Sequence, residues 1–324
     1  MISNFLFLIA GLMLLIKGAD YLVDGSSDIA KKLKVSGLVI GLTVVAFGTS
    51  APELAVNVIS SIQGNTEIAL GNINGSNIAN ILLVIGITAL ITRIPVQSRT
   101  MIKEVPFMIL AGVVLVFIML DGPLEGAAGN IISRIDGIML LCFFAIFLYY
   151  MYLSARDITT ATIERAKYKL WKSVSLTIFG LVGLLLGAKL TVLGASGIAL
   201  GLGITQGLVA LTLIAVGTSL PELVTAIVAA RKGETDLAVG NVVGSNIFNI
   251  LFVLGITATI TPIAVNLAQL TDALVALAAM LTLLIIIHTG KFLKKDANKD
   301  VSFNEGIFLL ACYAVYIAFI VWRG

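Results

Sequence analysis

Long apolar segments, separated by short polar connections, occupy nearly the whole chain. Each segment is close to or above about 20 residues, the length that an α-helix needs to cross the hydrocarbon core of a bilayer. The pattern predicts an all-α membrane protein with ten transmembrane helices, at residues 3–25, 36–61, 66–92, 101–120, 131–154, 172–197, 204–230, 235–260, 267–288 and 304–322.

The composition agrees with this prediction and argues against several other classes of protein. Of the 324 residues, 59% are hydrophobic and 12% are charged, whereas a soluble domain has about 25% charged residues. The small net charge of +3 leaves no basic face for a nucleic acid. With one histidine and no nucleophile–base pair, we expect neither an enzyme nor a cofactor. Cys142 and Cys312 stand apart in apolar segments, so we interpret them as packing residues.

Lysine and arginine are confined almost entirely to alternate loops. The loops after the odd-numbered predicted helices hold 17 of the 21 basic residues, whereas the loops at 62–65, 121–130, 198–203 and 261–266 hold none. Basic loops stay on the cytoplasmic side of a membrane. We therefore expect a multi-pass protein of the cell membrane with both termini outside the cell.

Two polar motifs recur at one fixed offset. The first half carries Gly-Thr-Ser-Ala-Pro-Glu at 48–53 and Gly-Asn-Ile-Asn-Gly-Ser-Asn-Ile-Ala-Asn at 71–80. The second half carries Gly-Thr-Ser-Leu-Pro-Glu at 217–222 and Gly-Asn-Val-Val-Gly-Ser-Asn-Ile-Phe-Asn at 240–249. Equivalent residues lie 169 positions apart, and the halves align without a gap from about residue 11 to about residue 92.

The repeat divides the chain into two halves of five predicted helices each. The first half covers 1–153, with its repeated segment at 41–92, and the second covers 172–324, with its repeated segment at 210–261. A charged cytoplasmic linker, 154–171, joins them. Because five is an odd number, the second half enters the membrane in the opposite sense. Inverted repeats of this kind are the usual architecture of secondary transporters, which bind substrate between the repeats.

The shorter motif combines a break in a helix with oxygen ligands. Pro52 has no N–H group, so we expect the carbonyls around Ala46 to Thr49 to lose their helical partners, and Pro221 should act in the same way in the second half. Carbonyl, hydroxyl and carboxylate oxygens suit Na⁺ and Ca²⁺ better than a soft transition metal.

Ser50 and Glu53 also fit a capping box, in which the two side chains close the start of a helix, and so do Ser219 and Glu222. A capping role and a ligand role are compatible. The ligand role is favoured because the motif occurs twice within apolar spans, where a carboxylate is costly and marks a functional site.

The longer motif places polar side chains on one helical face, since Asn72, Ser76 and Asn80 are four residues apart. Asn241, Ser245 and Asn249 repeat the stripe. The paired glycines of each copy, Gly71 with Gly75 and Gly240 with Gly244, predict close helix packing. We interpret four of these polar residues as ligands, namely Ser76, Asn80, Ser245 and Asn249. The remaining asparagines are interpreted as structural: Asn72, Asn77, Asn241 and Asn246.

The two motifs bring two carboxylates, Glu53 and Glu222, into one expected midplane site. Two carboxylates in a poorly solvated site cannot both stay ionised without a cation or a proton. One Ca²⁺, two Na⁺ or two protons would each neutralise the pair. A site that is unstable when empty and charged favours exchange, because one ion leaves as another replaces it.

These paired motifs resemble the alpha repeats of the cation/calcium exchanger superfamily, in particular the prokaryotic sodium/calcium exchangers, over nearly the whole chain. The resemblance implies ten helices in two inverted halves, with ions held between the second, third, seventh and eighth. It also implies that the first and sixth helices slide as a pair. The ligands that it implies are Thr49, Ser50, Glu53, Ser76, Asn80, Thr218, Ser219, Glu222, Ser245 and Asn249, together with the carbonyls of Ala46 and Ala215.

The function that follows is Na⁺/Ca²⁺ antiport by a protein that works as a monomer in the bilayer. Some relatives carry Asp where this chain has Asn249, so the fixed charge here is −2 and K⁺ dependence is not expected. Exchange of three Na⁺ for one Ca²⁺, as the resemblance suggests, would be electrogenic. A Ca²⁺/H⁺ antiporter on the same fold is the alternative. A channel or a non-transporting Ca²⁺-binding protein fits the broken helices and the repeat less well.

The first predicted helix contains charged residues that need partners. Lys17, Asp20 and Asp24 lie within two turns, and Lys189 in the sixth helix is equivalent to Asp20. An Asp20 pair with Lys17 or with Lys189 would make burial tolerable, so a structural role is favoured over ion binding.

Overall fold

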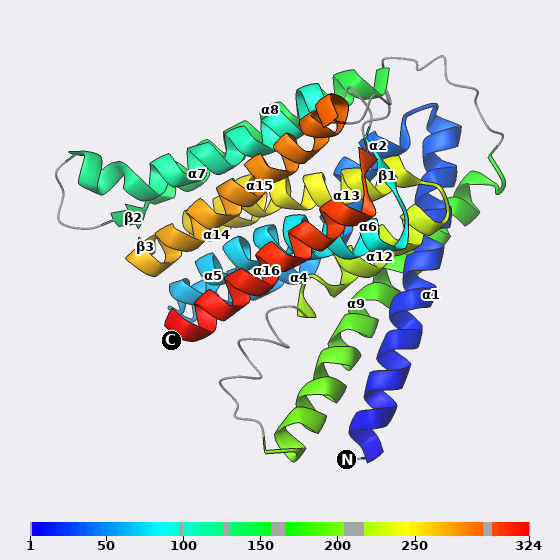
Figure 1. Ribbon diagram of the computed structural model, residues 1–324, viewed down its shortest axis with the longest axis horizontal. Helices are drawn as coiled ribbons and strands as arrows, with labels where there is room; N and C mark the ends of the chain where they lie inside the picture. Colours follow the sequence, from blue (N-terminus) through cyan, green and yellow to red (C-terminus); the bar gives the residue numbers. More distant parts are fainter. Residues whose placement is uncertain are drawn as a thin grey trace. The chain divides into compact units, whose positions relative to one another are not determined.

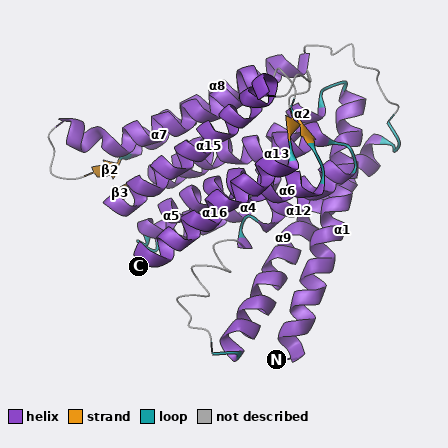
Figure 2. Cartoon of the chain, viewed as in Figure 1, coloured by secondary structure: helices purple, strands orange, loops and turns teal. Residues whose placement is uncertain are grey.

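The computed structural model describes residues 2–96, 100–125, 130–156, 166–203, 217–293 and 300–323. Helices make up nearly all of these residues, and the strands are short (Figure 2). The chain forms two compact units. Unit 1 consists of Met1–Pro52 and Ser154–Asn241, and unit 2 consists of Glu53–Leu153 and Val242–Gly324.

Eight helices of the described residues are long and apolar enough to cross a membrane, and a bent pair, Gly37–Thr49 with Ala51–Ile62, would make nine. The two members of this pair differ in direction by 44°. The predicted seventh span at 204–230 falls partly on residues 204–216, which lie outside the described residues. The all-helical membrane fold is therefore confirmed with eight or nine candidate spans, and the count of ten stays a prediction.

Unit 1 is built around two long helices that run side by side, blue and green in Figure 1. Its elements are α1 (Ile2–Leu33), α2 (Gly37–Ile40), the π-helical segment η1 (Gly41–Val45), α3 (Ala46–Thr49), α9 (Leu170–Gly201), α12 (Leu220–Arg231) and most of α13 (Thr235–Ile247). Helix α1 ends where Lys34 turns to a positive φ of 56°. The hydroxyl of Ser36 then accepts from the Val39 amide and caps α2.

Glycines allow α1 and α9 to approach until their backbones touch. A Cβ atom on Gly18 would lie 2.6 Å from the backbone nitrogen of Leu184, and one on Gly180 would lie 2.4 Å from that of Leu22. These distances are too short for any side chain. Small residues at such an interface let two membrane helices gain van der Waals contact along their length.

Unit 2 contains the remaining helices and four short strands. Its elements are α4 (Ala51–Ile62, from Glu53 onward), α5 (Thr66–Ile78), η2 (Ala79–Val84), α6 (Ile85–Ile91), β1 (Ile94–Pro95), η3 (Thr100–Glu104), α7 (Val105–Glu125), β2 (Asn130–Ile132), α8 (Arg134–Arg156), η5 (Phe248–Val253), α14 (Leu254–Ile260), β3 (Ile263–Val265), α15 (Leu267–Leu293), β4 (Asp300–Val301) and α16 (Phe303–Arg323). Helix α15 packs on α5 and α7, and α16 packs on α6 and η2.

Aromatic side chains form part of the core of unit 2. The ring centroid of Phe144 on α8 lies 4.9 Å from those of Phe248 and Phe252 on η5. Phe147, which is fully buried, lies 5.3 Å from Phe107 on α7. Tilted and edge-to-face rings of this kind add packing energy and orient η5, which carries part of the second polar motif.

The strands form two ladders that obey the same offset of 169 residues as the motifs. In one, Ile94 pairs with Val301, and in the other Ile263 pairs with Ile132, which is the same pair of positions with the halves exchanged. Glycine contacts follow the same rule, with Gly86 against Gly306 and Gly255 against Gly137. The correspondence between the halves thus reaches beyond residue 92, where the sequence alignment ends.

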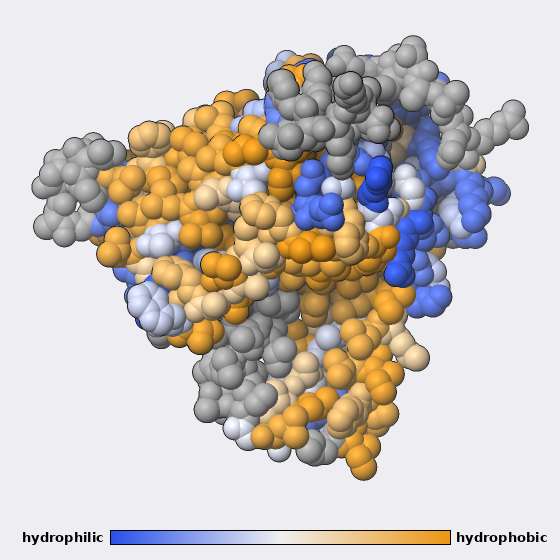
Figure 3. Space-filling view, viewed as in Figure 1, coloured by the Kyte–Doolittle hydropathy of each residue, from blue (hydrophilic) through white to orange (hydrophobic). Residues whose placement is uncertain are grey.

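Large apolar side chains cover much of the surface, as the orange areas of Figure 3 show. On unit 1, Phe5, Met13 and Phe179 expose half or more of their surface along α1 and α9. Exposed apolar area of this extent fits contact with lipid rather than with water.

Candidate functional site

The helix break in each half falls at the serine of the shorter motif. Ser50 has φ −84° and ψ 8°, and Ser219 has φ −87° and ψ 1°. Both angles lie in the sparsely populated bridge region, where active-site residues are found more often than elsewhere. Pro52 and Pro221 sit in the first turn of the following helix, where a missing N–H has no consequence.

The expectation of free carbonyls in the first half is wrong in one respect. The Ala46 carbonyl accepts the Ser50 amide at 3.0 Å and the Thr49 hydroxyl at 3.4 Å, because the helix continues through residue 49. Ala215, its equivalent in the second half, lies outside the described residues.

Unit 1 holds one of the two glutamates among hydroxyl and amide groups. Glu222 on α12 is 1% exposed, and its Oε1 accepts the Ser50 hydroxyl at 3.2 Å. The amide of Asn241 on α13 orders the surrounding groups, since its Oδ1 accepts the Thr49 hydroxyl at 3.0 Å and its Nδ2 donates to the Glu222 carbonyl at 3.4 Å.

The two serines of the shorter motif differ in their contacts. Ser219 is 2% exposed, makes no capping bond, and its Oγ has no hydrogen-bond partner in the part of the chain that the structure describes. The capping box is therefore not formed at this residue. Thr218, beside it, is half-buried. An unsatisfied buried hydroxyl is costly and calls for an explanation such as a bound ion or water.

Unit 2 holds the other glutamate in a similar setting. Glu53 on α4 is 1% exposed, and its Oε1 accepts the hydroxyl of Ser76 on α5 at 3.3 Å. Its backbone carbonyl accepts the Asn57 amide at 2.6 Å. Ser245, equivalent to Ser76, is fully buried. Each unit thus combines one carboxylate with hydroxyl oxygens of the repeated motifs.

The last asparagine of each longer motif lies in a π-helical segment. Asn80 belongs to η2 and Asn249 to η5, and the two segments occupy equivalent positions in the repeat. The Asn249 amide donates to Asn77 Oδ1 at 3.2 Å. Both Asn80 Oδ1 and Asn249 Oδ1 are buried without a hydrogen-bond partner among the described residues. Single π-turns often mark functional sites because they redirect a side chain out of the regular helical stripe.

Sequence reasoning did not find these π-helical segments, nor the role of Asn57. No sequence signal distinguishes a π-turn from the α-helix around it. The nearest clue is a buried threonine at each end, since Thr88 donates to the Val84 carbonyl at 2.7 Å and Thr257 to the Val253 carbonyl at 2.6 Å. Both bonds serve the residue that closes the π-helical segment.

Two packing expectations need correction. No atom of the described residues would come within 4 Å of a Cβ on Gly71 or Gly75, so these glycines do not mediate close contact. Gly240 does, because its Cβ would lie 2.7 Å from the Leu38 carbonyl. Asp20 pairs with neither predicted lysine; Lys232, in the turn after α12, lies 3.2 Å from it and 2.8 Å from Asp24.

The end of α1 that carries these carboxylates borders a polar cavity of about 370 Å³ in unit 1. Ser27 donates to Glu234, which also pairs with Lys31 at 3.4 Å. Asp28 accepts the Ser173 hydroxyl at 2.6 Å. A hydrogen bond with Tyr168 raises the pKa of Lys167, so this lysine is charged at neutral pH. The carboxylates of the cavity are matched by lysines or hydroxyls, which indicates a structural role.

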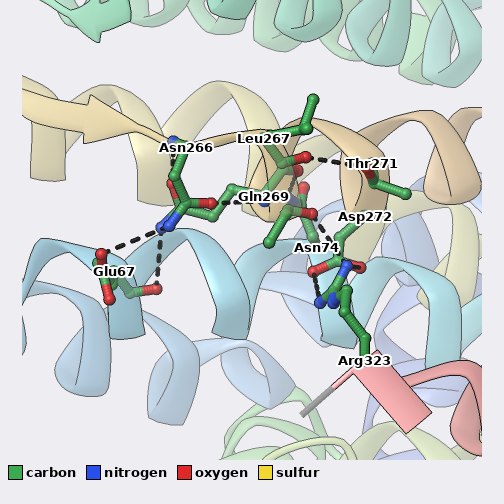
Figure 4. Close-up of polar contacts among 9 residues, drawn as sticks. Glu67, Asn74, Asn266, Leu267, Gln269, Thr271, Asp272 and Arg323 are labelled. Carbon is green, nitrogen blue, oxygen red and sulfur yellow. Dashed lines mark hydrogen bonds and ion pairs between the residues drawn. The ribbon is translucent and has the colours of Figure 1, made fainter.

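A second polar network ties helices of unit 2 together (Figure 4). Asp272 on α15, which is buried, receives both guanidinium nitrogens of Arg323 on α16 at 2.9 and 3.0 Å. The carbonyl of Gln269 accepts the Asn74 amide at 3.1 Å, and its side chain reaches the Glu67 carbonyl on α5. A bidentate pair of this kind is strong and directional. The network anchors α15 and α16 and leaves no oxygen cluster for an ion.

The buried oxygens of the two motifs, carried by many apolar helices, define a membrane transporter. The chain belongs to the sodium/calcium exchanger protein family, whose profile matches residues 3–153 and 172–322. It is an exchanger of the cation/calcium exchanger superfamily and not an enzyme, which confirms the resemblance seen in the motifs.

Individual relatives match over nearly their whole length. The chain is 39% identical over 317 residues to CaxA of Alkalimonas amylolytica, with 96% of each chain covered. It is 33% identical to the sodium/calcium exchanger MaX1 of Methanosarcina acetivorans, with 97% of each covered. Among solved structures, the sodium-calcium exchanger NCX_Mj superposes with a TM-score of 0.81 at 33% identity, over 98% of each chain.

Proposed function

We propose that this protein exchanges Na⁺ for Ca²⁺ across the cell membrane by alternating access. The observation that carries the proposal is the pair of equivalent amide oxygens, Asn80 Oδ1 and Asn249 Oδ1, which are buried without a partner among the described residues. A buried amide oxygen without a hydrogen bond is costly, and a cation would satisfy it. Glu53 and Glu222 supply the charge that such a cation needs.

The proposed ligands are the oxygens of both repeated motifs: Thr49, Ser50, Glu53, Ser76, Asn80, Thr218, Ser219, Glu222, Ser245 and Asn249, with the carbonyls of Ala46 and Ala215. All are hard ligands of the kind that Ca²⁺ takes in sets of six to eight. The Ala46 carbonyl keeps a lone pair besides its hydrogen bonds, so it stays in the set.

Sodium is favoured over protons as the counter-ion. A proton needs one basic atom and no coordination shell, whereas the hydroxyl and amide oxygens near each carboxylate provide such a shell. Ser50 bonded to Glu222 and Ser76 bonded to Glu53 are the described examples. The coordination chemistry therefore supports Na⁺/Ca²⁺ exchange ahead of Ca²⁺/H⁺ exchange.

Three further properties belong to the proposal. The two halves form ten spans in an inverted repeat with both termini outside, as the distribution of Lys and Arg supports. Transport is independent of K⁺, because Asn80 and Asn249 are amides and the ligand set has only two carboxylates. Exchange of three Na⁺ for one Ca²⁺ is electrogenic, and one chain carries it out without a partner subunit.

The experiment is ⁴⁵Ca²⁺ uptake into proteoliposomes loaded with Na⁺. We expect uptake when external Na⁺ is replaced by choline, without K⁺ on either side. With valinomycin and K⁺ gradients to set the membrane potential, uptake should become faster when the interior is negative, since more positive charge leaves as Na⁺ than enters as Ca²⁺. Uptake that follows a pH gradient and ignores Na⁺ would instead identify a Ca²⁺/H⁺ antiporter.

The same assay tests the site. Glu53→Gln and Glu222→Gln keep the shape of the side chain and remove its charge, so we expect each to abolish Ca²⁺ exchange, to below about 1% of the wild-type rate, since a lost charge interaction of about 3 kcal/mol lowers binding by roughly 150-fold. Glu305→Gln, in the first turn of α16, is the matched control with an unchanged rate. Near-normal exchange by either site variant would refute the assignment.

A further inference from the structure

Helices α4 and α12 are equivalent elements with different chemistry on their buried faces. Each has 12 residues, and Ala51–Ile62 maps onto Leu220–Arg231 at the offset of 169. Both begin one residue after the serine at the break and carry their glutamate in the first turn. Any difference between them beyond the glutamate is therefore a difference between the two ends of the transport route, not a difference of fold.

On α4, the buried residues are all polar: Glu53, Asn57, Ser60 and Ser61. At the equivalent positions after Glu222, α12 has alanines, namely Ala226, Ala229 and Ala230, which are also buried. Alanine at these positions satisfies the packing of α12. The fold therefore does not demand an amide and two hydroxyls at the same positions of α4.

Two of the polar atoms on α4 have no hydrogen-bond partner in the described part of the chain. Asn57 is 0% exposed, and its Oδ1 is unpaired while its amide donates to the Glu53 carbonyl. Ser61 is 1% exposed, and its Oγ is unpaired. Residues four apart on a helix are neighbours on one face. Burying such atoms without a partner is unfavourable, so they indicate a bound ion or water.

We propose that Asn57 Oδ1 and Ser61 Oγ form a transit site for Na⁺ on the extracellular side of Glu53. The inference rests on the proposed function and orientation, in which α4 runs outward to the loop at 62–65, which has no Lys or Arg, and α12 runs toward the cytoplasmic Arg231 and Lys232. The site takes Na⁺ with part of its water, since two neutral oxygens do not supply the carboxylates and the six to eight ligands that Ca²⁺ requires.

The proposal makes the two ends of the route unequal. A sodium ion that enters from outside meets ligands one and two turns before Glu53, whereas α12 offers only alanines at the corresponding positions. The transit site should therefore lower the external Na⁺ concentration needed for exchange and leave the cytoplasmic requirement unchanged.

The first test converts α4 to the chemistry of α12. Asn57→Ala and Ser61→Ala are made separately, and Na⁺-dependent ⁴⁵Ca²⁺ release is measured in right-side-out and inside-out membrane vesicles. We expect the external Na⁺ concentration for half-maximal exchange to rise about fivefold in each variant, the loss of one ligand oxygen at about 1 kcal/mol. The cytoplasmic value should stay unchanged. Ser61 makes no described hydrogen bond, so its variant removes an oxygen alone.

The control is Val56→Ala on the same turn, which removes apolar atoms and no oxygen and should alter neither value. Equal changes on both faces of the membrane, or no change on either, would overturn the transit site. Loss of all exchange in Asn57→Ala together with normal external Na⁺ dependence in Ser61→Ala would also overturn it, because a shared site requires a shared effect.

The second test does not depend on Ca²⁺ transport. In a chain with Cys142→Ala and Cys312→Ala, Ser61→Cys is exposed from outside to a small cationic methanethiosulfonate reagent. We expect modification, slowed when NaCl replaces choline chloride, whereas Ala230→Cys should not react from that side. A Ser61→Cys thiol that is unreactive, or reactive without regard to Na⁺, refutes the transit site. Sodium protection without Na⁺-driven Ca²⁺ flux in wild type would refute the proposed function alone.

Discussion

Single residues decide which ions this protein can hold, and the amides of the longer motif are central to that choice. Asn80 and Asn249 each present a carbonyl oxygen from a π-helical segment, and neither adds charge. Their equivalent positions leave the proposed ligand set with two carboxylates, Glu53 and Glu222. A charge of −2 matches one Ca²⁺ and is overmatched by three Na⁺, so either load can be released.

A third carboxylate should upset this balance. In Asn249→Asp, the new oxygen has no proton to donate to Asn77, so a bound cation must offset the added charge. We expect the Ca²⁺ concentration for half-maximal exchange to fall by about tenfold, which corresponds to about 1.4 kcal/mol, and the maximal rate to fall as release slows. Titration of exchange against Ca²⁺ measures both. Asn249→Ala should shift the half-maximal concentration the other way, and a faster Asn249→Asp variant would contradict the electrostatic account.

At the scale of elements, breaks and distortions place the polar groups. The helix interruptions at Ser50 and Ser219 and the π-turns of η2 and η5 are equivalent pairs, so each half positions its oxygens in the same way. Regular α-helices would point these groups along a single stripe. The long helices α1 and α9 have a different task, since glycines bring their backbones into contact along unit 1.

Filling that contact should separate the helices. A Cβ on Gly180 would lie 2.4 Å from the Leu22 nitrogen, and backbone cannot move aside as a side chain can. We expect Gly180→Val to destabilise the protein by about 2 kcal/mol and to lower its unfolding temperature in detergent. Gly71→Val is the matched control, because no described atom lies within 4 Å of that position. Equal melting of the two variants would show that the α1–α9 contact contributes little.

At the scale of the whole molecule, the chain is organised in two different ways at once. Its sequence repeats at an offset of 169, whereas its compact units exchange segments between the halves: unit 1 takes Met1–Pro52 from the first and most of Ser154–Asn241 from the second. The boundaries at 52/53 and 241/242 fall inside α4 and α13, at the polar motifs themselves. Motifs at unit boundaries are well placed to couple ion binding to movement.

The orientation in the membrane is a property of the whole chain and is open to direct measurement. In a chain without Cys142 and Cys312, Ser3→Cys and Gln63→Cys should react with an impermeant thiol reagent on intact cells. Lys34→Cys should react only after the membrane is opened. The reason is the concentration of Lys and Arg in alternate loops, which stay in the cytoplasm. Labelling of Lys34→Cys from outside would reverse the proposed topology.

Much of the candidate site was accessible from the sequence, because repetition and burial cost are both visible there. Polar residues that recur at a fixed offset within apolar spans identify themselves, and Glu53 and Glu222 are indeed buried in the structure. The partners of those residues were not accessible. Asp20 was paired with the wrong lysine because Lys232, its partner, lies 212 residues away and belongs to no repeated motif.

The sequence by itself determined the class of molecule, the repeat and the choice of oxygen ligands, since hydropathy, spacing and residue type are local properties. Only the tertiary structure decided where each helix breaks, that Asn80 and Asn249 lie in π-turns, and that α4 buries unpaired polar atoms where α12 buries alanine. Backbone distortion and the satisfaction of buried polar groups depend on what packs around a segment. Residues far apart in the chain supply that packing, so no local pattern records it.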